Sequence, residues 1–283
     1  MSTHPAYQFL KPKTDGILPL VFDSPHSGTE FPDDFKTDNS QQDLKTAWDA
    51  FIEDLWLPSV DQGASLLAAN FPRVYIDPNR APDDIDPEIL AAQWPGAKPT
   101  AFSDRGMGLI RRFILPGKPL YTAPLSVAEV QNRLDHYYTP YHNALKNNLD
   151  QLHQQFGAVW HIDCHSMKSK GNAMNIDNGL PRPDVILGDL DGTSAEVGFT
   201  RVVEKAFQDL GYSVVRNDPY KGGYVVKEYG HPTDNRHSIQ IELNRRLYMD
   251  EAHFLPHENY DQFKKHLAIV SLAIADYVRA RLK

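Results

Sequence analysis

Short apolar runs bounded by turn-forming residues recur along the chain and predict β-strands. Most of these runs are continuously apolar, which is typical of strands that are buried on both faces, as in a largely parallel sheet. The predicted strands cover residues 17–25, 64–70, 73–77, 158–164, 184–189, 213–216 and 238–243.

Helical patterns separate these strands. The predicted helices cover roughly residues 41–60, 126–156, 194–210 and 259–281. Strands interleaved with long helices predict an α/β fold in which helices are layered on a largely parallel sheet. Because the chain has no internal repeat, low-complexity segment or break in composition, we expect one domain over residues 1–283.

Residues 78–125 depart from this pattern because they are rich in proline and glycine. Such a long segment with little regular structure inside a compact domain is usually a functional loop. We therefore expect residues 78–125 to form a binding loop or a lid over an active site.

Composition narrows the class of protein. The chain has 283 residues, 41% of them hydrophobic, which is enough to enclose a substantial core. The N-terminus lacks the pattern of a secretory signal and no apolar run approaches a membrane span, so we expect a soluble cytoplasmic protein with no membrane partner. A single cysteine excludes a cysteine-rich zinc module, so any metal must be held by histidine and carboxylate side chains.

The net charge of −8 argues against a nucleic-acid partner, because phosphate binding requires a surplus of lysine and arginine. A small anionic substrate remains compatible with this charge if a few arginines converge in a cleft. The sequence gives no indication of the oligomeric state.

The polar residues suited to chemistry follow predicted strands. Ligands of open α/β sheets bind beyond the carboxyl ends of the strands, where the loops converge. Residues at these strand ends are His26, Asn79 with Arg80, His165 and Glu242.

The segment AVWHIDCHSM (residues 158–167) combines two histidines, an aspartate and the only cysteine. Side chains alternate along a strand, so His161, Asp163 and His165 share one face and Cys164 lies on the other. Cys164 is therefore predicted to be a small buried hydrophobic residue rather than a nucleophile paired with His165. His161 is compatible with a hydrogen-bonded position in the core, and Asp163 with a supporting partner of His165.

Two histidines flanked by small residues, His26 and His165, are candidate zinc ligands. A catalytic zinc site takes three protein ligands and leaves one position for water, so a carboxylate is required. Glu30 and Asp49, the latter in the predicted helix 41–60, are the alternatives. Glu242 is either a general base, with its pKa raised by burial, or the partner of Arg245 or Arg246 in a structural ion pair.

The chain resembles the N-formylglutamate amidohydrolase family from about Val21 to about Met249. The resemblance rests on motifs in the family's order, SPHSGTEFP, DPNR, GMGLI with GKPLY, DCHSM, KGGYVVKEYGHP and IQIELNRRLYM. The family is related to zinc carboxypeptidases, succinylglutamate desuccinylase and aspartoacylase. The resemblance implies a three-layer α/β/α fold with a central mixed sheet, similar to that of zinc carboxypeptidases, and one catalytic zinc ion.

The resemblance also implies roles for individual residues. His26 and His165 would bind zinc, with Asp49 preferred over Glu30 as the third ligand because the spacing of Glu30 departs from that of the carboxypeptidase relatives. Glu242 would act as the base that activates the zinc-bound water. Asn79 and Arg80 match a pair that holds a substrate carboxylate in the relatives. Other candidates for substrate or oxyanion contacts, besides a catalytic Arg80, are Arg111, Lys221, Tyr224, His231, Arg236 and Arg245.

The function implied is the zinc-dependent hydrolysis of N-formyl-L-glutamate to formate and L-glutamate, a step that the family performs in histidine degradation. Two alternatives stay open. One is a zinc hydrolase acting on another N-acyl amino acid or on a peptide C-terminus. The other is a non-catalytic module that captures an acidic amino acid.

Overall fold

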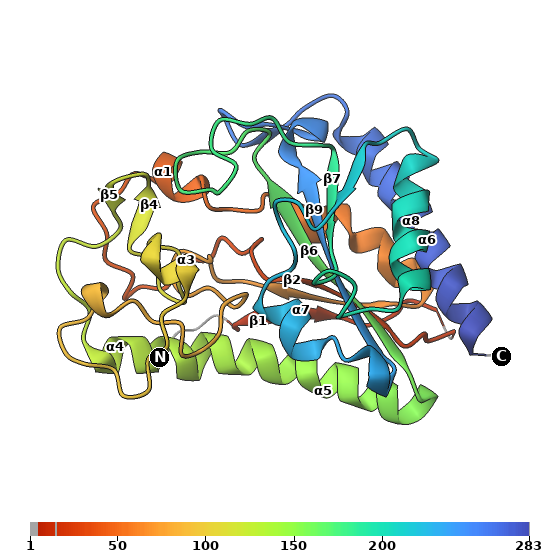
Figure 1. Cartoon of the computed structure of the whole chain (residues 1–283), viewed down its shortest axis with the longest axis horizontal. Helices are drawn as coiled ribbons and strands as arrows, with labels where there is room; N and C mark the ends of the chain where they lie inside the picture. Colours follow the sequence, from red (N-terminus) through yellow and green to blue (C-terminus); the bar gives the residue numbers. More distant parts are fainter. Residues whose placement is uncertain (1–4, 15, 283) are drawn as a thin grey trace.

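A mixed seven-stranded sheet forms the centre of the part of the chain that the computed structural model describes, residues 5–14 and 16–282 (Figure 1). The strand order is β1-β3-β2-β6-β9-β7-β8. The strands are β1 (Tyr7–Leu10), β2 (Leu20–Ser24), β3 (Ser65–Ala69), β6 (Val159–Met167), β7 (Val185–Gly188), β8 (Val214–Arg216) and β9 (Arg236–Asn244).

Most neighbouring strands in this sheet are parallel, as predicted. β3, β2, β6 and β9 run in the same direction, whereas β1 and β7 are antiparallel to their neighbours β3 and β9. The carboxyl ends of β2, β6 and β9 consequently lie at one edge of the sheet. The predicted α/β class with a mixed, largely parallel sheet is confirmed.

Helices cover both faces of the sheet (Figure 1). Residues of α2 (Ile52–Leu55), α6 (Val197–Gln208) and α8 (Tyr260–Arg281) belong to the core on one face. Residues of α4 (Val127–Arg133), α5 (Thr139–Phe156) and α7 (Tyr224–Tyr229) belong to the core on the other. The alternation predicted for residues 158–167 is confirmed, because Cys164 packs in the first core, whereas His161, Asp163 and His165 lie on the opposite face.

The helix predicted over residues 41–60 is wrong as a continuous element. The structure has α1 (Gln41–Lys45), α2 and a 3₁₀ helix, η1 (Leu57–Gln62), with a break between α1 and α2. Phe51 ends this break in a left-handed conformation, with φ of 64°, which is unfavourable for a bulky side chain and is found mostly where the surrounding structure enforces it.

The strand predicted over residues 73–77 is also wrong. The backbone N–H of Tyr75 donates to the carbonyl of Pro72 and closes a turn. The run is apolar because all three of its central residues are buried. Tyr75 and Ile76 belong to the core on one face of the sheet, and Val74 belongs to a smaller cluster with Leu44 and Ile114. A short apolar run does not by itself distinguish a strand from another buried segment.

The other predicted helices are present, with one irregularity. Residues 127–156 form a continuous helical rod in which a π-helical turn, η3 (Leu134–Tyr138), joins α4 to α5. Residues 78–125 contain only short elements, namely η2 (Pro87–Ile89), α3 (Ala101–Asp104) and the hairpin of β4 (Phe113–Leu115) and β5 (Lys118–Pro119). The remaining short elements are η4 (Pro232–Asp234), η5 (Arg245–Leu247), β10 (Met249–Asp250) and β11 (Leu255–Pro256). Within the described residues, every helix is too short or too polar to cross a membrane.

Candidate active site

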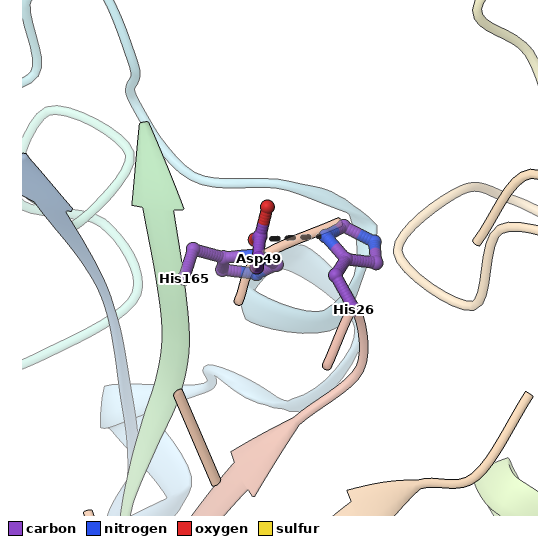
Figure 2. Close-up of side chains that lie close together, drawn as sticks. All are labelled: His26, Asp49 and His165. Carbon is purple, nitrogen blue, oxygen red and sulfur yellow. Dashed lines mark hydrogen bonds and ion pairs between the residues drawn. The ribbon is translucent and has the colours of Figure 1, made fainter. Parts of the chain in front are cut away.

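His26, Asp49 and His165 converge at the carboxyl edge of the sheet (Figure 2). All three are almost completely buried, and one potential ligand atom from each lies within 4.8 Å of the others. The two imidazole rings are 4.5 Å apart between centroids. Three segments far apart in the sequence therefore meet at one point.

The break after α1 is what brings Asp49 to this point. The N–H of Asp49 donates to the carbonyl of His26 at 3.1 Å, which attaches the break to the loop that follows β2. The Oδ2 atom of Asp49 lies 3.1 Å from Nδ1 of His165 and 3.4 Å from Nδ1 of His26. Burial would raise the pKa of Asp49, but its hydrogen bond with His165 and its contact with His26 hold that pKa well below its usual value. Asp49 is therefore an anion in this site.

The two histidines share the same orientation. Each directs Nδ1 towards Asp49 and places Nε2 against a buried carboxylate, 2.7 Å from Oδ1 of Asp77 for His26 and 2.7 Å from Oδ1 of Asp163 for His165. This arrangement is typical of metal-binding histidines, because the outer carboxylate fixes the tautomer and raises the basicity of the ligating nitrogen. Nδ1 of His26 is buried and has no hydrogen-bond partner within the described part of the chain. These residues fit a divalent metal that prefers nitrogen and oxygen ligands.

Glu30, the alternative third ligand, is exposed and lies outside this group. Asp77 is a supporting residue that the sequence did not single out, although it begins the DPNR motif. It accepts hydrogen bonds from Nε and Nη2 of Arg73 as well as contacting His26.

Glu242 lies beside His165 because the two residues are partners in the parallel register of β6 and β9. Its carboxylate accepts a hydrogen bond from Nε2 of Gln240 at 2.8 Å. Burial raises the pKa of Glu242, opposed by the charge of His165 and reinforced by that of Asp49. The alternative that Glu242 forms an ion pair with Arg245 or Arg246 is wrong, since these arginines pair with Asp49 and Asp184.

Asn79 and Arg80 lie on a loop that is held from two sides. The Oδ1 atom of Asn79 accepts from the N–H of Val225 in α7, and its Nδ2 atom donates to Asp163. Gly223 allows this contact, because a Cβ atom there would lie 2.2 Å from Oδ1 of Asn79. The guanidinium of Arg80 donates to the carbonyls of Met107 and Asn79, and lies 3.9 Å from the centre of the Phe102 ring.

The helical rod supports the same loop from the other side. The carbonyls of residues 75, 78 and 80 accept hydrogen bonds from three side chains of the rod. These donors are Nη1 of Arg133 at 2.8 Å, Nε2 of His142 at 2.9 Å and the hydroxyl of Tyr138 at 2.9 Å.

A cavity of about 390 Å³ lies above the three converging residues and is within the size range of small-molecule sites. Residues 78–125 supply part of its wall, including Arg80 and Arg111. The cavity is rich in cations although the chain is acidic. The lysines and arginines that line it are Arg73, Arg80, Arg105, Arg111, Lys168, Arg182, Lys221 and Arg245.

Arg111 is the clearest uncompensated cation of the cavity. It is 8% exposed, its Nε atom is buried, and no hydrogen-bond acceptor for that atom occurs among the described residues. Burial, together with the charge of Arg73, lowers the pKa of Arg111 to about 9. A buried guanidinium that lacks a hydrogen-bond acceptor is stabilised by an anionic ligand.

The other predicted contact residues divide into two groups. Lys221 and Arg245 line the cavity, but Lys221 is exposed and pairs with Asp191, and Arg245 donates to Asp49 at 2.9 Å. Three candidates do not line it, namely Tyr224, His231 and Arg236. Arg236 begins β9 at the edge opposite Glu242, where it pairs with Asp150, and His231 forms a bridge with Arg236.

His161 and Asp23 form a separate buried network below the site. Nε2 of His161 contacts Asp23 at 2.9 Å, and Nδ1 contacts the hydroxyl of Ser238 at 2.8 Å. The prediction of a hydrogen-bonded core position for His161 is confirmed.

Comparisons with known proteins identify relatives over most of the chain. A family described as N-formylglutamate amidohydrolase matches residues 18–249. A protein named N-formylglutamate deformylase from Pseudomonas putida is 32% identical over 243 residues, which cover 84% of each chain. One with the same name from Pseudomonas aeruginosa is 31% identical over 242 residues, which cover 83% of this chain and 84% of the relative.

Solved structures give the same result. The crystal structure of N-formylglutamate amidohydrolase from Ralstonia eutropha JMP134 has a TM-score of 0.94 and 42% sequence identity, with 98% of this chain and 100% of that chain covered. A gene product from Agrobacterium tumefaciens, with a TM-score of 0.67, 17% identity and coverage of 97% and 96%, shares the fold.

An α/β sheet that carries a buried carboxylate beside a His-Asp-His group, taken with these relatives, defines the protein as a hydrolase that acts on an amide. The chain belongs to the N-formylglutamate amidohydrolase family.

Proposed function

We propose that the protein is a zinc-dependent deformylase that hydrolyses N-formyl-L-glutamate to formate and L-glutamate. The observation that carries this proposal is the convergence of His26, Asp49 and His165 below a cavity lined by cations. The names of the relatives, and the large share of the chain that they match, support the choice of substrate.

The zinc would be held by Nδ1 of His26, Nδ1 of His165 and a carboxylate oxygen of Asp49. When bound, zinc lowers the pKa of a water ligand to about 7 and polarises a carbonyl oxygen. Three protein ligands, rather than four, are typical of a catalytic zinc site. Asp77 and Asp163 would keep both imidazoles in the tautomer that presents Nδ1 to the metal.

Glu242 would act as the general base and then as the general acid. Its carboxylate takes a proton from the attacking water, whose oxygen forms a bond to the formyl carbon. When the C–N bond breaks, the carboxylic acid returns the proton to the nitrogen of glutamate. The raised pKa supports both steps, because proton transfer is most efficient when the pKa of the group approaches the working pH.

The substrate is an anion, and the cavity supplies the opposite charge. Arg111, with no acceptor for its buried Nε, is our first candidate for a carboxylate of the substrate. Arg80, held by Met107 and Asn79, would contact the substrate carboxylate or the oxyanion that forms as water attacks. Asn79 would act mainly by fixing this loop, since both ends of its amide already have partners.

The proposal is tested by measuring the metal content and the release of formate together. We expect the purified protein to contain about one zinc per chain, and to release formate from N-formyl-L-glutamate. N-acetyl- and N-succinyl-L-glutamate serve as comparison substrates, and we expect both to react at least tenfold more slowly because their acyl groups are larger.

Removal of the metal provides the second part of this test. Treatment with a strong chelator should abolish formate release, and added zinc should restore it. Unchanged turnover after the metal has been removed would refute the zinc mechanism. Binding of substrate without release of formate would favour a non-catalytic module instead.

A further inference from the structure

Lys168 lies at the wall of the cavity with a side chain that has no hydrogen bond or ion pair among the described residues. It follows the last residue of β6 directly, and its backbone carbonyl accepts a hydrogen bond from Nη1 of Arg182. The side chain is half-buried and lines the cavity. Within the described residues, no hydrogen bond or ion pair involves its ammonium group.

The surroundings of Lys168 are mostly cationic. Burial, followed by the charges of Arg245 and Arg111, lowers the pKa of Lys168 to about 8, while Glu251 opposes this change. Both carboxylate oxygens of Glu251 already accept from the N–H of Ser169. A half-buried ammonium group among cations is stabilised by the arrival of an anion.

Two other cations near Lys168 have carboxylate partners. Arg182 pairs with Asp177 through two hydrogen bonds, and Arg245 pairs with Asp49. Lys168 and Arg111 line the same cavity, and neither side chain has a hydrogen bond or an ion pair in the described part of the chain. Two such cations match a ligand that carries two carboxylates.

We propose that Lys168 determines specificity by binding a second carboxylate of the substrate, so that the cavity selects N-acyl derivatives of dicarboxylic amino acids over those of neutral ones. Arg111 binds the other carboxylate. This inference rests on the proposed function, which it deepens by assigning a residue to the selection of the amino-acid part.

The test removes the charge from the enzyme and from the substrate in turn. N-formyl-L-glutamine has the shape of N-formyl-L-glutamate but a neutral side chain, and Lys168→Met keeps the length of the lysine without its charge. We expect Lys168→Met to lower kcat/KM for N-formyl-L-glutamate about tenfold to hundredfold, the range expected for a lost charge-assisted hydrogen bond. For N-formyl-L-glutamine, we expect a change of less than about threefold.

Two further variants complete the comparison. Lys170→Met, at an exposed lysine of the same segment, should leave both substrates unaffected. Lys168→Arg should recover part of the preference for glutamate. The inference is overturned if Lys168→Met lowers kcat/KM equally for both substrates, or changes it for neither.

A failure of the proposed function gives a different result. In that case the wild-type protein releases formate from neither substrate. Calorimetric titration with L-glutamate and L-glutamine then still tests the role of Lys168. Loss of the preference for L-glutamate in Lys168→Met supports that role, and an unchanged preference, or the absence of one in the wild type, overturns it.

Discussion

At the scale of single residues, the site depends on which atom each buried side chain presents. His26 and His165 both direct Nδ1 to Asp49 because Asp77 and Asp163 occupy the region of Nε2. Five buried groups thus share one consistent arrangement around Asp49. Such preorganisation avoids rearrangement of the polar groups during the reaction.

The substitution Glu242→Gln tests the proposed role of Glu242 as the general base. Glutamine has the same shape and can still accept the hydrogen bond from Gln240, but it cannot take up a proton. We expect kcat to fall by about 10²–10⁴-fold, the usual contribution of a general base. The metal content should not change, because Glu242 is not one of the three converging residues.

The control for this prediction is Glu258→Gln, a change at an exposed glutamate, which should behave like the wild type. Full turnover by Glu242→Gln with metal bound would show that another group is the base.

The substitution Asp77→Asn tests whether the carboxylate of Asp77, which contacts Nε2 of His26, strengthens the binding of metal by His26. The asparagine no longer provides a charged acceptor for Nε2, so His26 would become a weaker ligand of the proposed zinc ion. We expect the affinity for zinc to fall by about 10- to 100-fold, as is typical when such a partner is lost. Competition with a chromogenic chelator would measure it, and the melting temperature of the metal-free variant would show whether the fold is intact. An unchanged zinc affinity would contradict the role of Asp77.

At the scale of elements, three strand ends and one helical rod determine the position of the site. β2, β6 and β9 end at the same edge of the sheet, and the rod of residues 127–156 binds the carbonyls of residues 75, 78 and 80. The π-helical turn lies in the N-terminal half of this rod, and such turns are frequently found near functional sites. The rod therefore holds Arg80 in place from outside the cavity.

Tyr138→Phe tests this support. The change removes only the hydroxyl that donates to the carbonyl of Arg80. We expect a loss of about 1 kcal/mol in the free energy of unfolding, typical of one buried hydrogen bond. We also expect KM to rise several-fold, with a smaller change in kcat, because Arg80 is held less firmly.

The neighbouring tyrosine provides a matched control. Tyr137 is buried on the same rod and packs against the rings of Phe71 and Tyr75. Its hydroxyl has no hydrogen bond to the loop of residues 75–80 in the described structure, so Tyr137→Phe should leave KM unchanged. Equal KM values for the two variants would show that Tyr138 has only a structural role.

At the scale of the whole molecule, a buried neutral histidine links stability to pH. His142 contacts the hydroxyl of Tyr229 and the carbonyl of Pro78, and burial lowers its pKa to about 4. Because the folded pKa is below the unfolded value of 6.5, the stabilisation is fully present above pH 6.5. It is lost progressively as the pH falls towards 4.

We expect this single group to account for up to about 3 kcal/mol of the loss in stability between pH 6.5 and 4, since each pKa unit corresponds to about 1.4 kcal/mol. Denaturant unfolding at several pH values would measure it. His142→Gln, which keeps one donor and one acceptor without titrating, should show a shallower dependence on pH. His136→Gln, at an exposed histidine of the same rod, should keep the slope of the wild type, and equal slopes for all three proteins would contradict the assignment.

Local patterns in the sequence are sufficient to predict the class of fold and several residues that lie together at the carboxyl edge of the sheet. Alternation along residues 158–167 correctly placed Cys164 in the core and His165 on the face of the site, because this property depends only on local strand geometry. The rule that reactive residues follow strands correctly selected His26, His165 and Glu242 as neighbours. The order of the motifs indicated the family that the comparisons confirm.

The way in which distant segments meet depends on long-range contacts in the folded chain. Asp49 reaches the site through a break in a segment whose local pattern is helical, and residues 73–77 form a turn although they are apolar. Arg245 pairs with Asp49, and Arg236 lies at the far edge. The side chains of Lys168 and Arg111 line the cavity without a hydrogen bond or ion pair to any described residue. Periodicity in the sequence reports local backbone geometry and burial, but ion pairing and exposure depend on contacts between residues far apart in the chain.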